Sequence, residues 1–154
     1  MKKILLFVFV VFASLTLFTG CKKSGTTTSG SYTMTVTVGG VAHTYSNVYA
    51  VLSGPYLTIT GNSGSTPGTT AYPAFSTVIY TYSAPGTYNV TSGSAGPGVA
   101  GTYAPDATMT NWDVAMSGSA TITAITATEV TGSVNFTNVS GTTSVGTFTA
   151  KKMW

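Results

Sequence analysis

In the segment that begins at Tyr32, apolar and polar residues alternate with a period of two. In Tyr32–Val38, Tyr, Met and Val occupy alternate positions and threonine occupies the positions between them. This period places the apolar side chains on one face of a β-strand and the threonines on the other. Gly39 and Gly40 follow, and both can accept the positive φ of a tight hairpin turn. We therefore predict a hairpin with three pairs on its apolar face: Val38 with Val41, Val36 with His43, and Met34 with Tyr45.

The same alternation returns in short segments up to the end of the chain, and no window has a sustained helical period. We expect loops at Gly61–Thr70 and Ser92–Gly101, a turn near Gly118 and a bulge near Gly146. The pattern predicts an all-β domain, an antiparallel β-sandwich or barrel of about nine or ten short strands. Beyond the first hairpin we expect strands at Asn47–Leu52, Tyr56–Thr60, Phe75–Tyr82, Thr87–Thr91, Asn111–Met116, Ala120–Ala124, Val130–Phe136 and Thr143–Ala150.

The first twenty residues have the pattern of an export signal. Lys2 and Lys3 precede an almost wholly apolar run, Ile4–Phe18, which is shorter than the about 20 residues that a membrane-spanning helix needs. Small residues then lead to the single cysteine, Cys21, as at a signal cleavage site. We predict a signal peptide at residues 1–20, and a single cysteine excludes an intramolecular disulfide.

The segment Leu17–Cys21 resembles the lipobox of bacterial lipoproteins, with Phe18 at the position that usually holds an aliphatic residue. The resemblance implies that the signal is cut before Cys21 and that this cysteine carries fatty-acyl chains such as palmitate. Two or three acyl chains would anchor the protein stably to a membrane. The predicted organisation is then a signal peptide, the lipidated Cys21 with a flexible Ser/Thr/Gly tether over residues 21–31, and an all-β domain over residues 32–154.

Three further features resemble a family of small Bacteroidetes lipoproteins of unknown function. They are Gly39-Gly40 followed by an aromatic residue at His43, the turn Pro85–Tyr88, and the closing run Gly118–Ala150. The family supplies no catalytic residues to transfer to this chain. The resemblance implies a bacterial cell envelope location, at the outer membrane. Because no acidic residue directly follows the cysteine, it favours the periplasmic side over the cell surface.

The charged residues are few, and the lysines lie only at the two ends of the chain. The six basic residues are Lys2, Lys3, Lys22, Lys23, Lys151 and Lys152, and between residues 24 and 150 only Asp106, Asp113 and Glu129 are charged. A nucleic-acid-binding domain needs a basic face to neutralise phosphates, so this class is excluded. The lack of arginine and of central lysines also argues against a site for phosphorylated ligands.

Few residues in the domain are suited to catalysis or metal binding. His43 is the only histidine, and with no second histidine or cysteine we interpret it as an aromatic side chain of the apolar face. We expect Asp106 to cap a turn, Asp113 to face away from its neighbours Trp112 and Val114, and Glu129 to lie near a hairpin end. The sequence therefore predicts no catalytic residue, no metal site and no cofactor.

The preferred hypothesis is a membrane-anchored binding or structural module without catalysis, whose partner is a glycan or another envelope protein. Its candidate contact regions are the loops at residues 61–70 and 92–101. Tyrosine is abundant, and exposed Tyr or Trp side chains stack on sugars or on protein partners. Two alternatives stay open: a small hydrolase that uses Asp106, Asp113 or Glu129, and a β-barrel that carries a ligand in an internal cavity.

Overall fold

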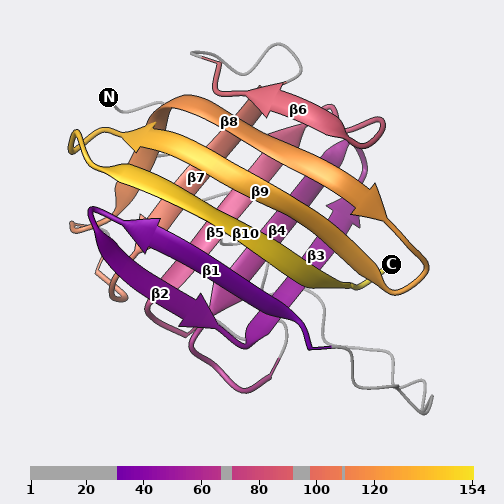
Figure 1. The fold of residues 1–154 in the computed structure, drawn as a ribbon, viewed down its shortest axis with the longest axis horizontal. Coiled ribbons are helices and arrows are strands. Elements are labelled where there is room, and N and C mark those ends of the chain that lie inside the picture. Colours follow the sequence, from indigo (N-terminus) through magenta and orange to yellow (C-terminus); the bar gives the residue numbers. More distant parts are fainter. Residues whose placement is uncertain (1–30, 67–70, 92–97, 109) are drawn as a thin grey trace.

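The computed structural model describes residues 31–66, 71–91, 98–108 and 110–154, and within these ranges all regular structure is β (Figure 1). Ten strands follow one another along the chain. They are β1 (Thr33–Val38), β2 (Val41–Tyr45), β3 (Asn47–Ser53), β4 (Tyr56–Asn62), β5 (Ala74–Tyr80), β6 (Gly86–Asn89), β7 (Gly98–Ala104), β8 (Asp113–Ile125), β9 (Glu129–Asn138) and β10 (Thr143–Lys152). The number agrees with the nine or ten predicted, but β7 was expected as a loop and β8 as two strands.

Seven of these strands close into a barrel in the order β3-β4-β5-β7-β8-β9-β10. All neighbouring pairs are antiparallel except β10 and β3, which run parallel and pair at Lys151 with Tyr49 and Lys152 with Ala50. The β1–β2 hairpin extends the sheet from β10, and β6 adds to β8. Figure 1 shows the barrel as two layers, with β1, β8, β9 and β10 in front of and crossing β3, β4, β5 and β7. The predicted all-β fold is confirmed, and it is a closed barrel.

The first hairpin has the predicted register, with Val38 paired to Val41, Val36 to His43 and Met34 to Tyr45. Gly39 and Gly40 both have positive φ, 56° and 84°, as this two-residue turn requires. His43 therefore lies on the face of β2 that turns toward the barrel interior. The period-two pattern and the two glycines were sufficient to predict this element.

The barrel interior is filled by apolar side chains from both layers. On the front layer Val36, Phe136 and Phe148 point inward, and on the back layer Leu57 and Ile79 meet them. Every residue of this core cluster lies between Met34 and Ala150. The core of the described residues therefore lies within the predicted β domain.

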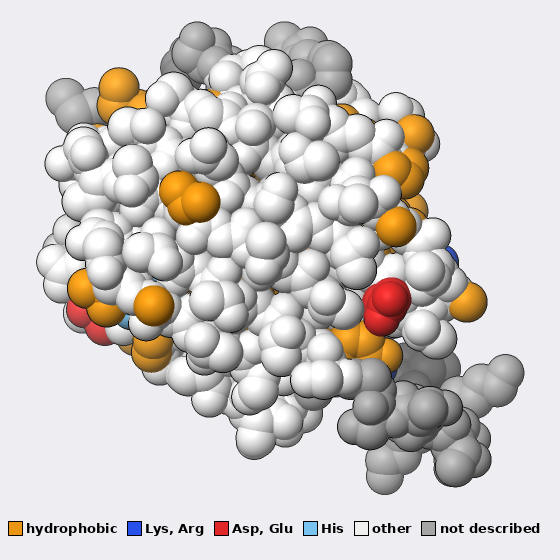
Figure 2. All heavy atoms as spheres, in the orientation of Figure 1, with side chains coloured by type: hydrophobic (Ala, Val, Ile, Leu, Met, Phe, Trp, Pro, Cys, Tyr) orange, Lys and Arg blue, Asp and Glu red, His pale blue; other side chains and the backbone are white. Residues whose placement is uncertain are grey.

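The outer face of the front layer is almost free of charged and large apolar side chains, as Figure 2 shows. The strand registers align hydroxyl-bearing residues across six neighbouring strands, the four of this layer together with β2 and β6 at its edges. Threonine suits such a half-exposed pleated surface. From β2 to β6 the row consists of Thr44, Thr35, Thr147, Ser133, Thr121 and Thr87.

One predicted loop is partly a strand of the barrel. The lack of large side chains predicts a loop at Ser92–Gly101, but Gly98–Ala104 forms β7 and Val99 is buried. Small residues are required there because a Cβ at Gly101 would lie 2.5 Å from the ring of Phe136. The first part of the predicted Gly61–Thr70 loop likewise belongs to β4, where Met34 and Tyr45 pack directly on Gly61.

Two predicted irregularities lie elsewhere than expected. No turn occurs near Gly118, because β8 continues through it, with Gly118 at a φ of 105° and register shifts at Ala115/Ser117 and Ile122/Ala124. Gly146 is regularly paired on both sides and is not a bulge; its lack of a side chain lets the backbone of Thr35 and Val36 approach closely.

Cys21, the predicted signal and most of the predicted tether lie outside the described residues. Within the described ranges, no helix has the length and apolar character needed to cross a membrane.

Candidate binding site

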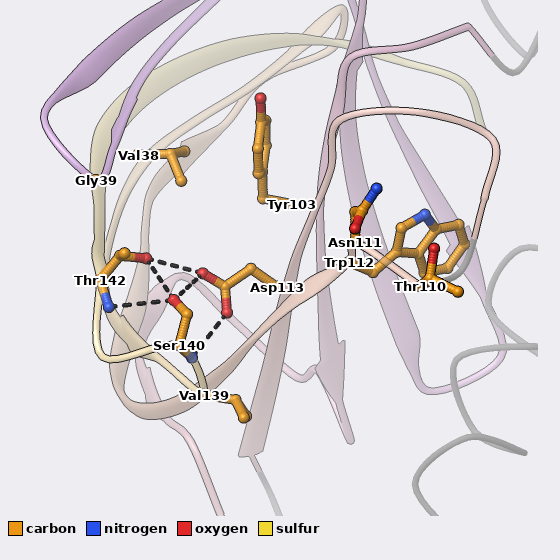
Figure 3. Close-up of a pocket in the computed structure, with 10 residues that line it drawn as sticks. All are labelled: Val38, Gly39, Tyr103, Thr110, Asn111, Trp112, Asp113, Val139, Ser140 and Thr142. Carbon is orange, nitrogen blue, oxygen red and sulfur yellow. Dashed lines mark hydrogen bonds between the residues drawn. The ribbon is translucent and has the colours of Figure 1, made fainter.

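A broad, open hollow of about 500 Å³ lies at one end of the barrel, which we call the mouth (Figure 3). Four segments that are distant in sequence surround it: the β1–β2 turn, the end of β7, the loop leading into β8, and the β9–β10 turn. Its lining residues are Val38, Gly39, Tyr103, Thr110, Asn111, Trp112, Asp113, Val139, Ser140 and Thr142. None of them is basic.

Asp113, at the start of β8, fixes one wall of the hollow by accepting hydrogen bonds from the β9–β10 turn. The Ser140 amide donates to Oδ1 at 3.2 Å, and the hydroxyls of Ser140 and Thr142 donate to Oδ2, the latter at 2.8 Å. Partial burial alone would raise the pKa of Asp113, but these hydrogen bonds lower it further than burial raises it. The carboxylate is therefore ionised at neutral pH and acts as an anionic wall of the hollow.

The β9–β10 turn is shaped by its own backbone so that Ser140 and Thr142 reach Asp113. Asn138 donates its backbone N–H to the Thr142 carbonyl at 2.8 Å, and Gly141, at a φ of 82°, donates to the Asn138 carbonyl at 2.9 Å. The buried Asn138 side chain donates to Ser144 Oγ at 2.8 Å. Val139, which is 65% exposed, projects at the rim.

Tyr103 supplies an aromatic side chain on the other side of the hollow. It lies at the end of β7 on the inward face, and the ring of His43 packs against it with centroids 5.0 Å apart. His43 in turn stacks on Tyr45 at 6.4 Å. Burial raises the pKa of Tyr103, so its hydroxyl stays protonated at neutral pH. The aromatic rings of His43 and Tyr45 on β2 thus form a stack that packs against Tyr103.

Asp106 organises the loop that carries Asn111 and Trp112. Its carboxylate accepts hydrogen bonds from the Thr108 amide at 2.8 Å and from Asn111 Nδ2 at 3.1 Å, and its carbonyl accepts one from Trp112 Nε1 at 3.2 Å. The side-chain hydrogen bonds of Thr108 and Asn111 hold the pKa of Asp106 below its usual value. The expected turn-capping role of Asp106 is confirmed, and the turn also positions two residues that line the hollow.

The three acids do not converge. Asp113 lines the hollow and Asp106 braces the adjacent loop, whereas Glu129 lies at the other end of β8 and β9, near the hairpin end as expected and opposite Lys151. Among the described residues, no group of three His, Cys, Asp or Glu side chains is close enough to hold a metal ion. His43 acts as a packing ring next to the hollow.

We predicted contact loops at residues 61–70 and 92–101, but none of their described residues lines this hollow. Residues 67–70 and 92–97 lie outside the described ranges. Sequence reasoning counted Tyr103 among the many tyrosines that could stack on a partner without singling it out, and it missed the roles of Ser140 and Thr142. The sequence contained one signal for this turn, because the short run of small residues Ser140–Thr142 comes directly after a strongly alternating strand.

The fold and this hollow define the chain as a closed β-barrel with a polar and aromatic mouth. Comparisons with protein-family models, with curated proteins and with solved structures gave no match. The resemblance to a Bacteroidetes lipoprotein family therefore stays a prediction.

Proposed function

We propose that this protein is a lipid-anchored module of the bacterial cell envelope that binds an uncharged glycan at the mouth of its barrel. The observation that carries the proposal is the composition of the hollow. Two aromatic residues, Tyr103 and Trp112, line it together with Asn111, Asp113 and three hydroxyl-bearing residues. In the interiors of β-barrels and in their mouths, a few fixed polar groups among apolar ones are typical of ligand sites.

Each part of the lining suits one part of a sugar. The apolar faces of a pyranose ring stack on aromatic rings, which favours contact with Tyr103. The ionised Asp113 accepts strong hydrogen bonds from hydroxyl groups, and the amide of Asn111 can both donate and accept. Phosphorylated or acidic sugars are disfavoured, because Asp113 repels anions and no described lining residue is basic.

Binding is a better proposal than hydrolysis. A glycoside hydrolase uses two carboxyl groups that flank the scissile bond, one of which is protonated at working pH. Among the described residues, Asp113 is the only acid that lines the hollow, and its lowered pKa keeps it ionised. Carriage of a ligand inside the barrel is also less favoured, because the interior is occupied by the core cluster.

The anchor is the second part of the proposal. It is supported by the sequence Leu17–Cys21 and by the apolar run before it. Membrane fractions of cells fed a labelled palmitate should contain labelled protein, and the Cys21→Ser variant should lose the label. An unlabelled protein of full length in the soluble fraction would contradict the anchor without bearing on the glycan site.

Binding is tested by titrating purified protein with a panel of neutral and acidic envelope oligosaccharides and measuring heat or fluorescence changes. We expect at least one neutral oligosaccharide to bind, and Tyr103→Ala to weaken that binding by about tenfold or more through loss of stacking. The matched control is Tyr56→Ala, which removes an exposed tyrosine that does not line the hollow. Asn111→Ala gives a second test if Tyr103→Ala is poorly folded. Equal binding by the Tyr103 and Tyr56 variants, or binding of none of the sugars, would contradict the glycan site and favour a protein partner.

A further inference from the structure

The registers of β1 and β10 show at which end the predicted tether joins the barrel. Thr33 pairs with Thr149 at one end of these strands, and Val38 pairs with Ser144 at the other. Val38 and Thr142 line the hollow, so the mouth is at the second end. Residue 32 and the end of β10 therefore share the opposite end, which we call the base. Figure 1 shows the start of β1 and the C-terminus on the same side of the barrel, with the β1–β2 and β9–β10 turns on the other.

The base presents two lysines followed by two large apolar residues, Lys151, Lys152, Met153 and Trp154, which we call the terminal patch. Met153 is 46% exposed and Trp154 is 43% exposed. The Lys152 ammonium lies 5.0 Å from the centre of the Trp154 ring, and it also donates to the Thr126 carbonyl at 3.4 Å. The patch is therefore held at the base, with an aromatic ring and cationic groups side by side.

Charge is distributed unequally along the barrel. The lysines that follow Cys21 are Lys22 and Lys23 beside it, and Lys151 and Lys152 at the base. Among the described residues, the acidic side chains Asp106 and Asp113 lie at the mouth, and Glu129 lies at the base across from Lys151. The described side chains thus make the base more positive than the mouth.

We propose that the terminal patch docks on the phosphate surface of the bilayer to which Cys21 is anchored, so that the mouth faces away from the membrane. This inference rests on the anchorage proposed above. Lysine is attracted to anionic headgroups, and tryptophan and other amphipathic side chains settle at the membrane–water interface. The mouth would then stand roughly 30 Å above the lipid surface, the length of a ten-residue strand.

A docking patch is needed because a tether alone does not set orientation. The chain from Cys21 to Tyr32 can reach at most about 40 Å, which would let a domain of this size turn its mouth toward the lipid. The same tether keeps the patch at a high effective concentration near the surface, so that a weak patch is sufficient. Lys22 and Lys23 add attraction next to the anchor.

The test uses the mature chain from Cys21 to Trp154, which keeps the whole core cluster. Because Cys21 is the only cysteine, its thiol can be coupled to a maleimide-bearing lipid in vesicles of phosphatidylglycerol and phosphatidylcholine. The protein has two tryptophans, Trp112 at the mouth and Trp154 at the base. Trp112→Phe and Trp154→Phe therefore each leave one reporter, whose fluorescence is quenched by brominated lipid only when it lies at the bilayer.

We expect brominated lipid to quench Trp154 at least about twofold more than Trp112, and the difference to shrink in vesicles of phosphatidylcholine alone. Salt of roughly 0.5 M should also reduce it, because it screens charge beyond a few ångströms. Lys151→Gln with Lys152→Gln should reduce it further. If Trp112→Phe disturbs the mouth loop, subtracting the Trp154→Phe signal from that of the unsubstituted chain gives the same quantity.

Equal quenching of the two tryptophans, stronger quenching of Trp112, or a difference insensitive to the lysines would overturn the docking proposal. The coupling chemistry replaces the natural acyl chains, so these outcomes do not depend on whether cells acylate Cys21. Failure of the anchor is instead measured by palmitate labelling, and the two proposals are therefore separable.

Discussion

At the mouth of the barrel, the carboxylates of Asp106 and Asp113 each accept several hydrogen bonds from neighbouring turns. At the base, Glu129 on β9 lies opposite Lys151 on the neighbouring strand β10, without such a network. The mouth therefore uses its charges to hold loops in place, whereas at the base the contacts of Lys152 with the Trp154 ring and the Thr126 carbonyl are exposed. The difference indicates that substitutions of charge should reduce stability at the mouth and should affect mainly interactions at the base.

The mouth and the base belong to one barrel, and the largest predicted effect is a loss of stability of that barrel. In Gly132→Val, the added Cβ would lie 2.2 Å from the Thr121 carbonyl oxygen and 2.6 Å from the Phe148 ring. Because the backbone cannot shift as a side chain can, we expect the free energy of unfolding to fall by about 3 kcal/mol or more. Thermal unfolding followed by circular dichroism should show a melting temperature lower by about 10 °C.

The matched control for this substitution is Gly86→Ala in β6, where nothing lies within 4 Å of the added Cβ. Its stability should change by no more than about 0.5 kcal/mol. Equal melting temperatures for the Gly132 and Gly86 variants would mean that the close packing of β8, β9 and β10 does not determine the stability of the barrel.

Removing the charge of Asp113 tests the mouth directly. Asp113→Asn leaves the Ser140 and Thr142 donors facing an amide instead of a carboxylate. We expect the free energy of unfolding to fall by about 1–2 kcal/mol, and not by more, because the site is partly exposed. Chemical denaturation measures it. At the base, Glu129→Gln should cost less than about 0.5 kcal/mol. A loss as large for Glu129→Gln as for Asp113→Asn would remove the distinction between the two ends.

These contrasts also show which parts of the molecule the sequence could predict. The first hairpin follows from local signals, namely the alternation up to Val38 and the pair Gly39-Gly40, because register in a tight hairpin is fixed by the turn. The role of Asp106 as a turn cap was local in the same way. Interactions between neighbours in sequence are thus accessible to pattern analysis.

Elements defined by distant contacts were not predicted. Strand β7 has a glycine at position 101 because Phe136, far along the chain, occupies the space above it. The wall of the hollow joins Asp113 to Ser140, 27 residues apart, and Tyr103 comes from a third segment. Only the closure of the barrel brings these residues together, and alternation within one strand carries no information on closure.

The pH dependence of stability should also originate at the mouth. The folded-state pKa values of Asp113 and Asp106 are lowered, so each contributes stability that is fully present above the unfolded value of about 3.9 and is lost as pH falls through the lower folded value. We expect their contribution to be constant from about pH 5 to 8 and to decline below about pH 4. In Asp113→Asn this acid-side decline should be smaller, as melting temperatures across pH 2–8, on the order of one pH unit apart, would show. An unchanged acid profile would contradict the lowered pKa of Asp113.

The smallest expected effect on stability is at the base, where Lys152→Gln removes the contact with the Trp154 ring and the hydrogen bond to Thr126. Both interactions are exposed, and a cation–π contact of this kind contributes about 0.5 kcal/mol. The melting temperature should fall by no more than about 3 °C. The same variant, coupled through Cys21 to anionic vesicles, should nevertheless show a clear loss of Trp154 quenching. A lysine whose removal leaves the fold intact and changes the membrane contact would separate the base from the mouth, where removal of a charge should weaken the fold itself. If the stability loss instead matched that of Asp113→Asn, Lys152 would be a structural residue and the terminal patch would lose its distinct role.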